Sequence, residues 1–111
     1  MAIPIWTIKQ GDTRPILAGT LTAGGNIIDL TSAATVKFTM TNSAGDVVID
    51  LGASDIVSPA INGQVTYAWG ADDTETAGEF QGEFKITWSD STVQRVPNRV
   101  NFQVIITPHL A

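Results

Sequence analysis

The sequence contains no cysteine, a single histidine and few charged residues, and these shortages limit how the chain can be stabilised and what its surface can be. Without cysteine, neither disulfides nor thiolate metal sites can hold this 111-residue chain together. Charged residues make up 15% of the chain, so much of the surface must be neutral Thr, Ser, Asn, Gln and Gly. At this length we expect one domain over residues 1–111, with one hydrophobic core and a short apolar N-terminal arm at residues 1–7.

Basic residues are scarcer than acidic ones. Six Lys and Arg stand against eleven Asp and Glu, which gives a net charge of −5. The basic residues are scattered along the sequence and form no run that could neutralise phosphates, so no nucleic-acid partner is expected. No uninterrupted apolar run approaches the roughly 20 residues that span a bilayer, and no membrane partner is expected either.

The chain consists largely of short segments in which apolar and polar residues alternate. In the clearest of them, one side carries apolar residues and glycine, namely Phe80, Gly82, Phe84, Ile86 and Trp88. A period of two places alternate residues on opposite faces of a sheet, so this segment is predicted to be a long, half-buried antiparallel strand.

Similar patterns recur between turn signals. Further strands are expected at 5–8, 14–22, 35–41, 47–49, 64–69, 92–96 and 100–106. No window shows a convincing period of 3.6 residues, and only residues 71–76 could form a single helical turn. The pattern predicts an all-β fold, an immunoglobulin-like antiparallel β-sandwich of about seven to nine strands.

The inward faces of these strands give a predicted core. Its members are Leu17, Leu21, Val36, Phe38, Met40, Val65, Tyr67, Trp69, Phe80, Phe84, Ile86, Trp88, Phe102, Val104 and Ile106. The start of the long strand resembles the Asp-Ala-Gly-x-Tyr entry into strand F of immunoglobulin-like domains. Phe80 stands at the tyrosine position and Gly82 at the position of the second antibody cysteine, which argues against an antibody-type domain.

A set of short pieces, in order along the chain, resembles the N-terminal domain of phage baseplate upper proteins and related small immunoglobulin-like phage domains. The pieces lie at residues 11–15, 21–31, 34–40, 63–69, 73–80 and 96–98. The resemblance implies a virion structural protein, a baseplate, tail or head-associated accessory subunit that is assembled in the host cytoplasm. Its implied partners are other phage structural proteins, and self-association into a homo-oligomer is compatible with that role. Because the chain stops at Ala111, an anchoring or decorating role is expected.

Few residues suggest chemistry. Asp72, Asp73, Glu75 and Glu79 form the densest acidic cluster and could ligate a hard cation such as Ca²⁺. Their spacing is not that of an EF-hand loop, and acidic residues at a helix start explain Asp72 and Asp73 equally well. His109 follows Pro108 with no acidic partner close in sequence, so no catalytic triad can be named. We therefore expect no enzyme activity, no metal and no cofactor.

The tryptophans and the N-terminal segment are the remaining candidates. Trp69 and Trp88 share faces with apolar residues and are expected in the core. The apolar segment formed by Ile3, Pro4, Ile5 and Trp6 either caps the sandwich or contacts a partner, with Trp6 as an aromatic anchor. The alternative function is a stand-alone carbohydrate-binding or cell-surface-binding module, which would need exposed aromatic residues or a Ca²⁺ loop.

Overall fold

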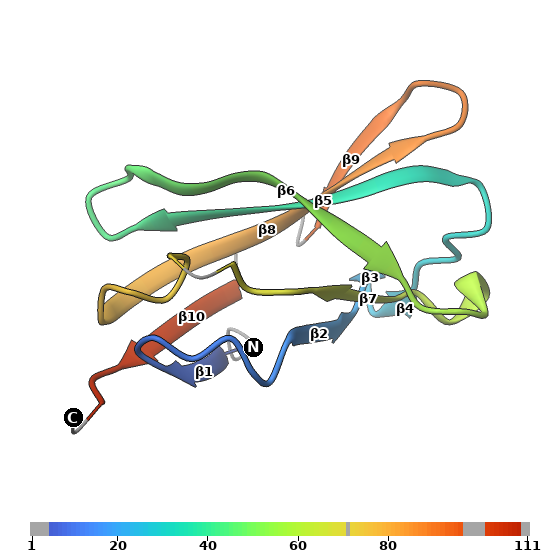
Figure 1. Cartoon of the computed structure of the whole chain (residues 1–111). Coiled ribbons are helices and arrows are strands. Elements are labelled where there is room, and N and C mark those ends of the chain that lie inside the picture. The colour runs from blue at the N-terminus through green and yellow to red at the C-terminus, as the bar shows by residue number, and fades with distance from the viewer. Residues whose placement is uncertain (1–4, 71, 97–101, 110–111) are drawn as a thin grey trace.

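The computed structural model describes residues 5–70, 72–96 and 102–109, and these residues form strands joined by turns (Figure 1). The elements, in chain order, are β1 (Ile5–Lys9), β2 (Leu17–Thr20), β3 (Thr22–Ala23), β4 (Asn26–Ile27), β5 (Ala33–Asn42), β6 (Val47–Ile56), the short 3-10 helix η1 (Ala60–Asn62), β7 (Gln64–Tyr67), β8 (Gly78–Trp88), β9 (Val93–Val96) and β10 (Phe102–Thr107).

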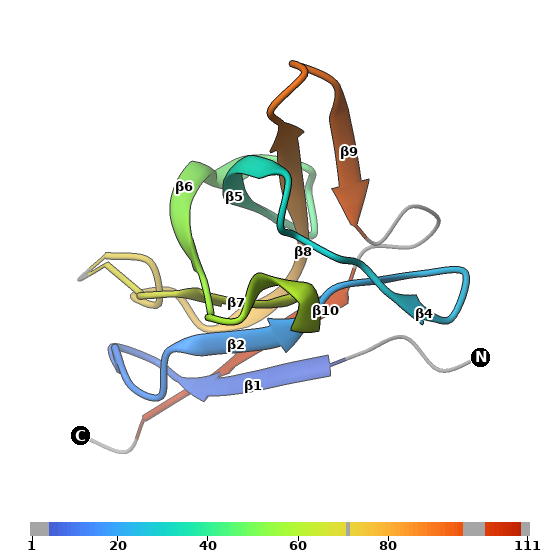
Figure 2. The ribbon, with the colours of Figure 1, turned by 90° about the vertical axis from the view of Figure 1, so that its right-hand side faces the viewer.

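Eight of the strands belong to one strongly curled sheet. Its order is β1-β10-β8-β5-β6-β7-β2, and β9 pairs with β8 off this path. In Figures 1 and 2 the two end strands of the path, β1 and β2, both lie below β5 and β8. The sheet therefore folds back on itself into a sandwich that approaches a barrel, while β3 and β4 form a separate small hairpin.

Two long strands organise this sheet. β8 pairs along one side with β5, and along the other side with β10 over its first half and β9 over its second half. β6 pairs first with β5 and then, at Asp55 and Ile56, with β7. The pairing of β6 with β5 is irregular near Leu51, whose φ is 52°. Since β-bulges bend the strand that carries them, this irregularity lets one strand serve both layers.

Aromatic rings fill the centre of the core. Phe38 is fully buried, and its ring centroid lies 5.0 Å from that of Tyr67 and 5.7 Å from that of Phe102. A Cβ atom at Gly82 would lie 2.7 Å from Cζ of Phe102 and 2.8 Å from Cε1 of Phe38. The rings of two neighbouring strands thus occupy the space over Gly82, the position at which antibody domains carry a cysteine.

The predicted fold class is confirmed, an all-β immunoglobulin-like sandwich, but some details differ. β1 and β10 are parallel, so the sheet is mixed. The strand expected at 14–22 is divided into β2 and β3, and the strand expected at 47–49 continues to Ile56. Residues 72–76, the described part of the possible helical turn at 71–76, form turns and bends.

The predicted core is confirmed except at two positions. Trp88 and Phe102 are only partly buried and pack against its edge. Five further hydrophobic residues are buried that the pattern did not single out, namely Ile8, Ile28, Leu30, Ile49 and Val96. Most of these lie at strand ends or in connections, where alternation gives no signal.

The N-terminal segment differs from the expected arm in the part that the structure describes. Ile5 and Thr7 belong to β1 and pair with residues of β10. Ile3 and Pro4 lie outside the described residues.

Candidate functional site

The acidic cluster lies in the connection between β7 and β8, where Asp73 has a structural role. One carboxylate oxygen of Asp73, Oδ2, accepts a hydrogen bond from the Tyr67 hydroxyl at 2.6 Å and another from the Gly70 backbone N–H at 2.7 Å. Burial, and then the hydrogen bond to Asp73, raises the pKa of the Tyr67 hydroxyl well above its ordinary value. Asp73 therefore ties this loop to the end of β7.

A second set of hydrogen bonds ties the same loop to the connection after β1. Thr74 is fully buried, and its hydroxyl donates to the Asp12 carbonyl at 2.8 Å. Its own carbonyl accepts from the Gly11 backbone N–H at 2.9 Å, and the Gln10 side-chain amide donates to the Glu75 carbonyl at 2.6 Å. The loop is thus fixed at two points and presents the exposed side chains of Asp72 and Glu75 to solvent.

The acidic residues border a shallow hollow of about 300 Å³, which also touches residues 42–44 and Val48. Among the described residues, no three His, Cys, Asp or Glu side chains gather closely enough to hold a metal ion. The cluster predicted as a Ca²⁺ alternative is therefore spread out, and one of its members, Asp73, is engaged by Tyr67 and Gly70.

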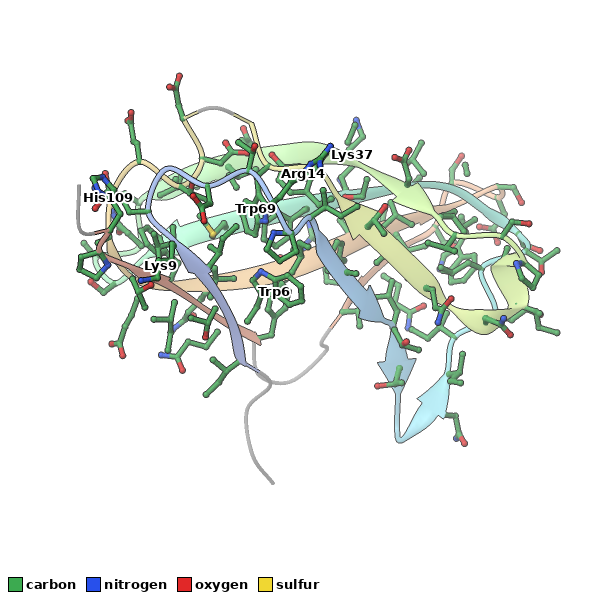
Figure 3. The ribbon with its side chains drawn as sticks, turned by 60° about the horizontal axis from the view of Figure 1, so that its bottom comes forward. Trp6, Lys9, Arg14, Lys37, Trp69 and His109 are labelled. Atoms are coloured by element: carbon green, nitrogen blue, oxygen red, sulfur yellow. The ribbon has the colours of Figure 1, made fainter. Side chains whose placement is uncertain are left out.

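The three tryptophans occupy different environments. Trp69 is buried, and its indole N–H donates to the Pro15 carbonyl at 3.2 Å. Trp6 is partly buried and packs against the core, so the capping alternative describes its position. Its indole nitrogen is buried and has no hydrogen-bond partner among the described residues. Figure 3 shows Trp6 and Trp69 between the ribbons of β1 and β2.

Other candidates remain at the surface. Ile5 is 59% exposed, which leaves it free for the predicted partner contact. His109 is exposed beyond the end of β10, and Figure 3 shows it at the same end as Lys9 and apart from Lys37. Within the described part of the chain, no hydrogen bond joins His109 to a carboxylate.

Strand register gathers basic residues that are scattered in the sequence. Lys37 of β5 lies opposite Lys85 of β8, and Lys85 lies opposite Arg95 of β9. Directly opposed residues have Cβ atoms about 5 Å apart, so three cations form a row across three strands. Arg95 pairs with Glu83 at 3.4 Å, whereas Lys37 and Lys85 have no ion-pair partner among the described residues. We call Lys37, Lys85 and Arg95 the basic row.

The sequence carries a signal for this row, but single strands do not reveal it. All three residues occupy outward positions of predicted strands, but only the pairing order β5-β8-β9 makes them neighbours. Among the described residues β9 pairs only with β8, and its far edge stands clear of the body in Figures 1 and 2. The basic row therefore ends at an open sheet edge.

These features define a class, an all-β protein with an immunoglobulin-like sandwich and charged surfaces. A solved structure with a similar fold is CopC from Methylosinus trichosporium OB3b, with 10% sequence identity and a TM-score of 0.54. The alignment covers 99% of this chain and 89% of that chain. At this identity the likeness shows the fold alone. No family model and no curated protein sequence matches the chain.

Among the described residues, no helix is long and apolar enough to cross a bilayer.

Proposed function

We propose that the protein is a bacteriophage virion structural protein, an accessory subunit of the baseplate, tail or head that anchors or decorates by protein–protein contact. The observation that carries the proposal is the open edge of β9 beside the outward faces of β5 and β8. An unpaired edge offers backbone hydrogen bonds to a partner strand, and the outward sheet face offers area for docking. The ordered resemblance of residues 11–98 to phage structural domains supports the same role.

The proposed role requires no catalysis. Asp73, which accepts hydrogen bonds from Tyr67 and Gly70, holds a loop, and His109 is exposed at the end of the described chain. The partners would be other phage structural proteins, and the protein would be found in the virion after assembly in the host cytoplasm. Repetition of a modest interface many times on a particle would provide strength through multivalency.

Purified particles of the phage that encodes this chain provide the test. We expect mass spectrometry to detect the protein in particles that have been banded on a density gradient and washed in high salt. A companion measurement on the unassembled lysate fraction shows that the protein is expressed. Expression without any protein in the particles would overturn the proposal.

The alternative, a carbohydrate-binding or cell-surface-binding module, finds less support in the positions of the aromatic residues. Sugar platforms use exposed rings, whereas Trp69 is buried and Trp6 and Trp88 are partly buried against the core. A glycan array probed with the isolated protein separates the two functions. Specific glycan binding by the monomer, together with absence from particles, would favour the alternative.

A further inference from the structure

An acidic loop and a basic row lie at different positions along β8. The acidic loop precedes β8 and the basic row crosses its second half, as the path of β8 in Figure 1 shows. Glu79 and Lys85 lie on the same outward face of β8, separated by roughly 20 Å of extended strand. The described fold measures 45 × 27 × 21 Å, so the two charge sets occupy different parts of an elongated molecule.

Arg95 pairs with Glu83, but the other cations of the basic row and the exposed acids of the loop have no ion-pair partner among the described residues. Lys37 and Lys85 are opposed to each other and form no ion pair with a described residue, although like charges placed directly opposite destabilise a sheet. Asp72 and Glu75 likewise form no ion pair in the described part of the chain. A cross-strand row of cations that costs stability in the monomer indicates a surface that is neutralised by something else.

The acidic loop is built to act as a rigid partner for that row. Asp73 and Thr74 fix the loop through hydrogen bonds to Tyr67 and to Asp12, so little conformational freedom would be lost when the loop docks. The side chains of Asp72, Glu75 and Glu79 stay exposed around this fixed loop. Gln10 and Asp12, which hydrogen-bond to the loop, are flanked in the chain by Lys9 and Arg14, and the four acidic residues of the loop outnumber these two cations.

We propose that the outer face of β5, β8 and β9 docks the acidic 72–79 loop of a second copy of this chain. Because the two patches differ, the contact is head-to-tail, and its repetition generates a ring or a filament. This inference deepens the proposed virion role by naming the first partner as the chain itself. Attraction across the contact rests on exposed charges, so it weakens as salt rises.

Charge exchange between the two patches gives a sharp test. One variant carries Lys37→Glu and Lys85→Glu, and the other carries Asp72→Lys and Glu75→Lys. Asp73 and Arg95 stay unchanged because they hold the loop and pair with Glu83. The control, Asp50→Lys, alters an exposed β6 residue outside both patches.

Sedimentation velocity of the purified protein is the measurement. We expect the wild-type chain and the control to self-associate at about 0.02 M salt and to dissociate at about 0.5 M salt. Each exchanged variant alone should associate at least about tenfold more weakly, since its exchanged side chains then face like charges across the contact. An equimolar mixture of the two variants should regain association, because each patch again meets its opposite.

The mixture also serves as the folding control, since misfolded variants would not restore a specific complex. A wild-type chain that stays monomeric at low salt would overturn the proposal. So would exchanged variants that associate like the wild type, or a mixture that stays monomeric. The purified chain alone is measured, so the result is independent of particle membership. A protein that is present in particles but monomeric in solution would contradict self-association through these patches and would still support the virion role.

Discussion

At the scale of single residues, the fold depends on a missing side chain at one position and on a single hydroxyl group at another. Gly82 leaves room for the rings of Phe38 and Phe102, and Tyr67 places its hydroxyl on Asp73. Neither role is visible in the sequence, because alternation shows which face a residue occupies but not what lies above it. Gly82 could be assigned to the core face by its place in the pattern, and its reason for being glycine came only from the packing.

Replacement of Gly82 by alanine should destabilise the protein. The added methyl group would overlap Phe102 and Phe38, and overpacking of a core costs about 1–3 kcal/mol. Gly19→Ala is the matched control, because a Cβ at this exposed β2 position meets no atom within 4 Å. The measurement is the free energy of unfolding from urea denaturation. Equal stability of the two variants would show that the rings do not occupy the space over Gly82.

We predict that the raised pKa of the Tyr67 hydroxyl makes the protein less stable at alkaline pH. Its pKa is raised in the folded state, so the stabilisation is complete below the unfolded pKa of about 10 and is lost as pH rises beyond it. Tyr67→Phe should cost about 1 kcal/mol near pH 7, because the hydroxyl no longer donates to Asp73. The difference between the two proteins should shrink between pH 10 and 11. A constant difference over pH 7–11 in thermal denaturation would contradict this role.

At the scale of elements, β8 could be predicted from sequence and β6 could not. β8 alternates without interruption from Phe80 to Trp88, so its faces follow from the period alone. β6 contains Gly52 and an irregularity at Leu51, which end the alternation that marks a strand. A Cβ at Gly52 would lie 2.5 Å from Cε1 of Tyr67, so this glycine admits a ring from another strand. Residues distant in sequence therefore determine where β6 can run.

The connection between β7 and β8 offers an element-scale prediction. Thr74→Val keeps the shape of the buried side chain but removes the hydrogen bond to the Asp12 carbonyl, at a cost of about 1 kcal/mol. Because the bond joins two loops, amide hydrogen exchange should accelerate in residues 10–12 and 72–77 and stay unchanged in β8. Thr76→Val is the control, since Thr76 is exposed in the same loop. Unchanged exchange in the Thr74 variant would show that the loop is held by its other contacts.

At the scale of the whole molecule, the sequence allowed the fold class to be predicted but not the charge layout. Net charge and the spacing of basic residues indicated a dispersed set, because they describe the chain in one dimension. Register converts residues 37, 85 and 95 into neighbours, and β8 then separates them from the acidic loop. The candidate docking face depends on pairing order, which no single segment encodes.

This layout predicts that one substitution has opposite effects on stability and association. Lys85→Gln removes the central cation of the basic row and with it two like-charge oppositions, to Lys37 and to Arg95. The free energy of unfolding of the monomer should therefore rise by about 0.5 kcal/mol without added salt, and by less once salt screens the charges. Self-association at low salt should weaken in the same variant, because the docking face loses part of its charge. Lys9→Gln serves as the control, since Lys9 lies opposite Thr107 and outside the row. A Lys85 variant that is less stable as a monomer would show that this lysine contributes to the fold and would remove the argument that the row is kept for a partner.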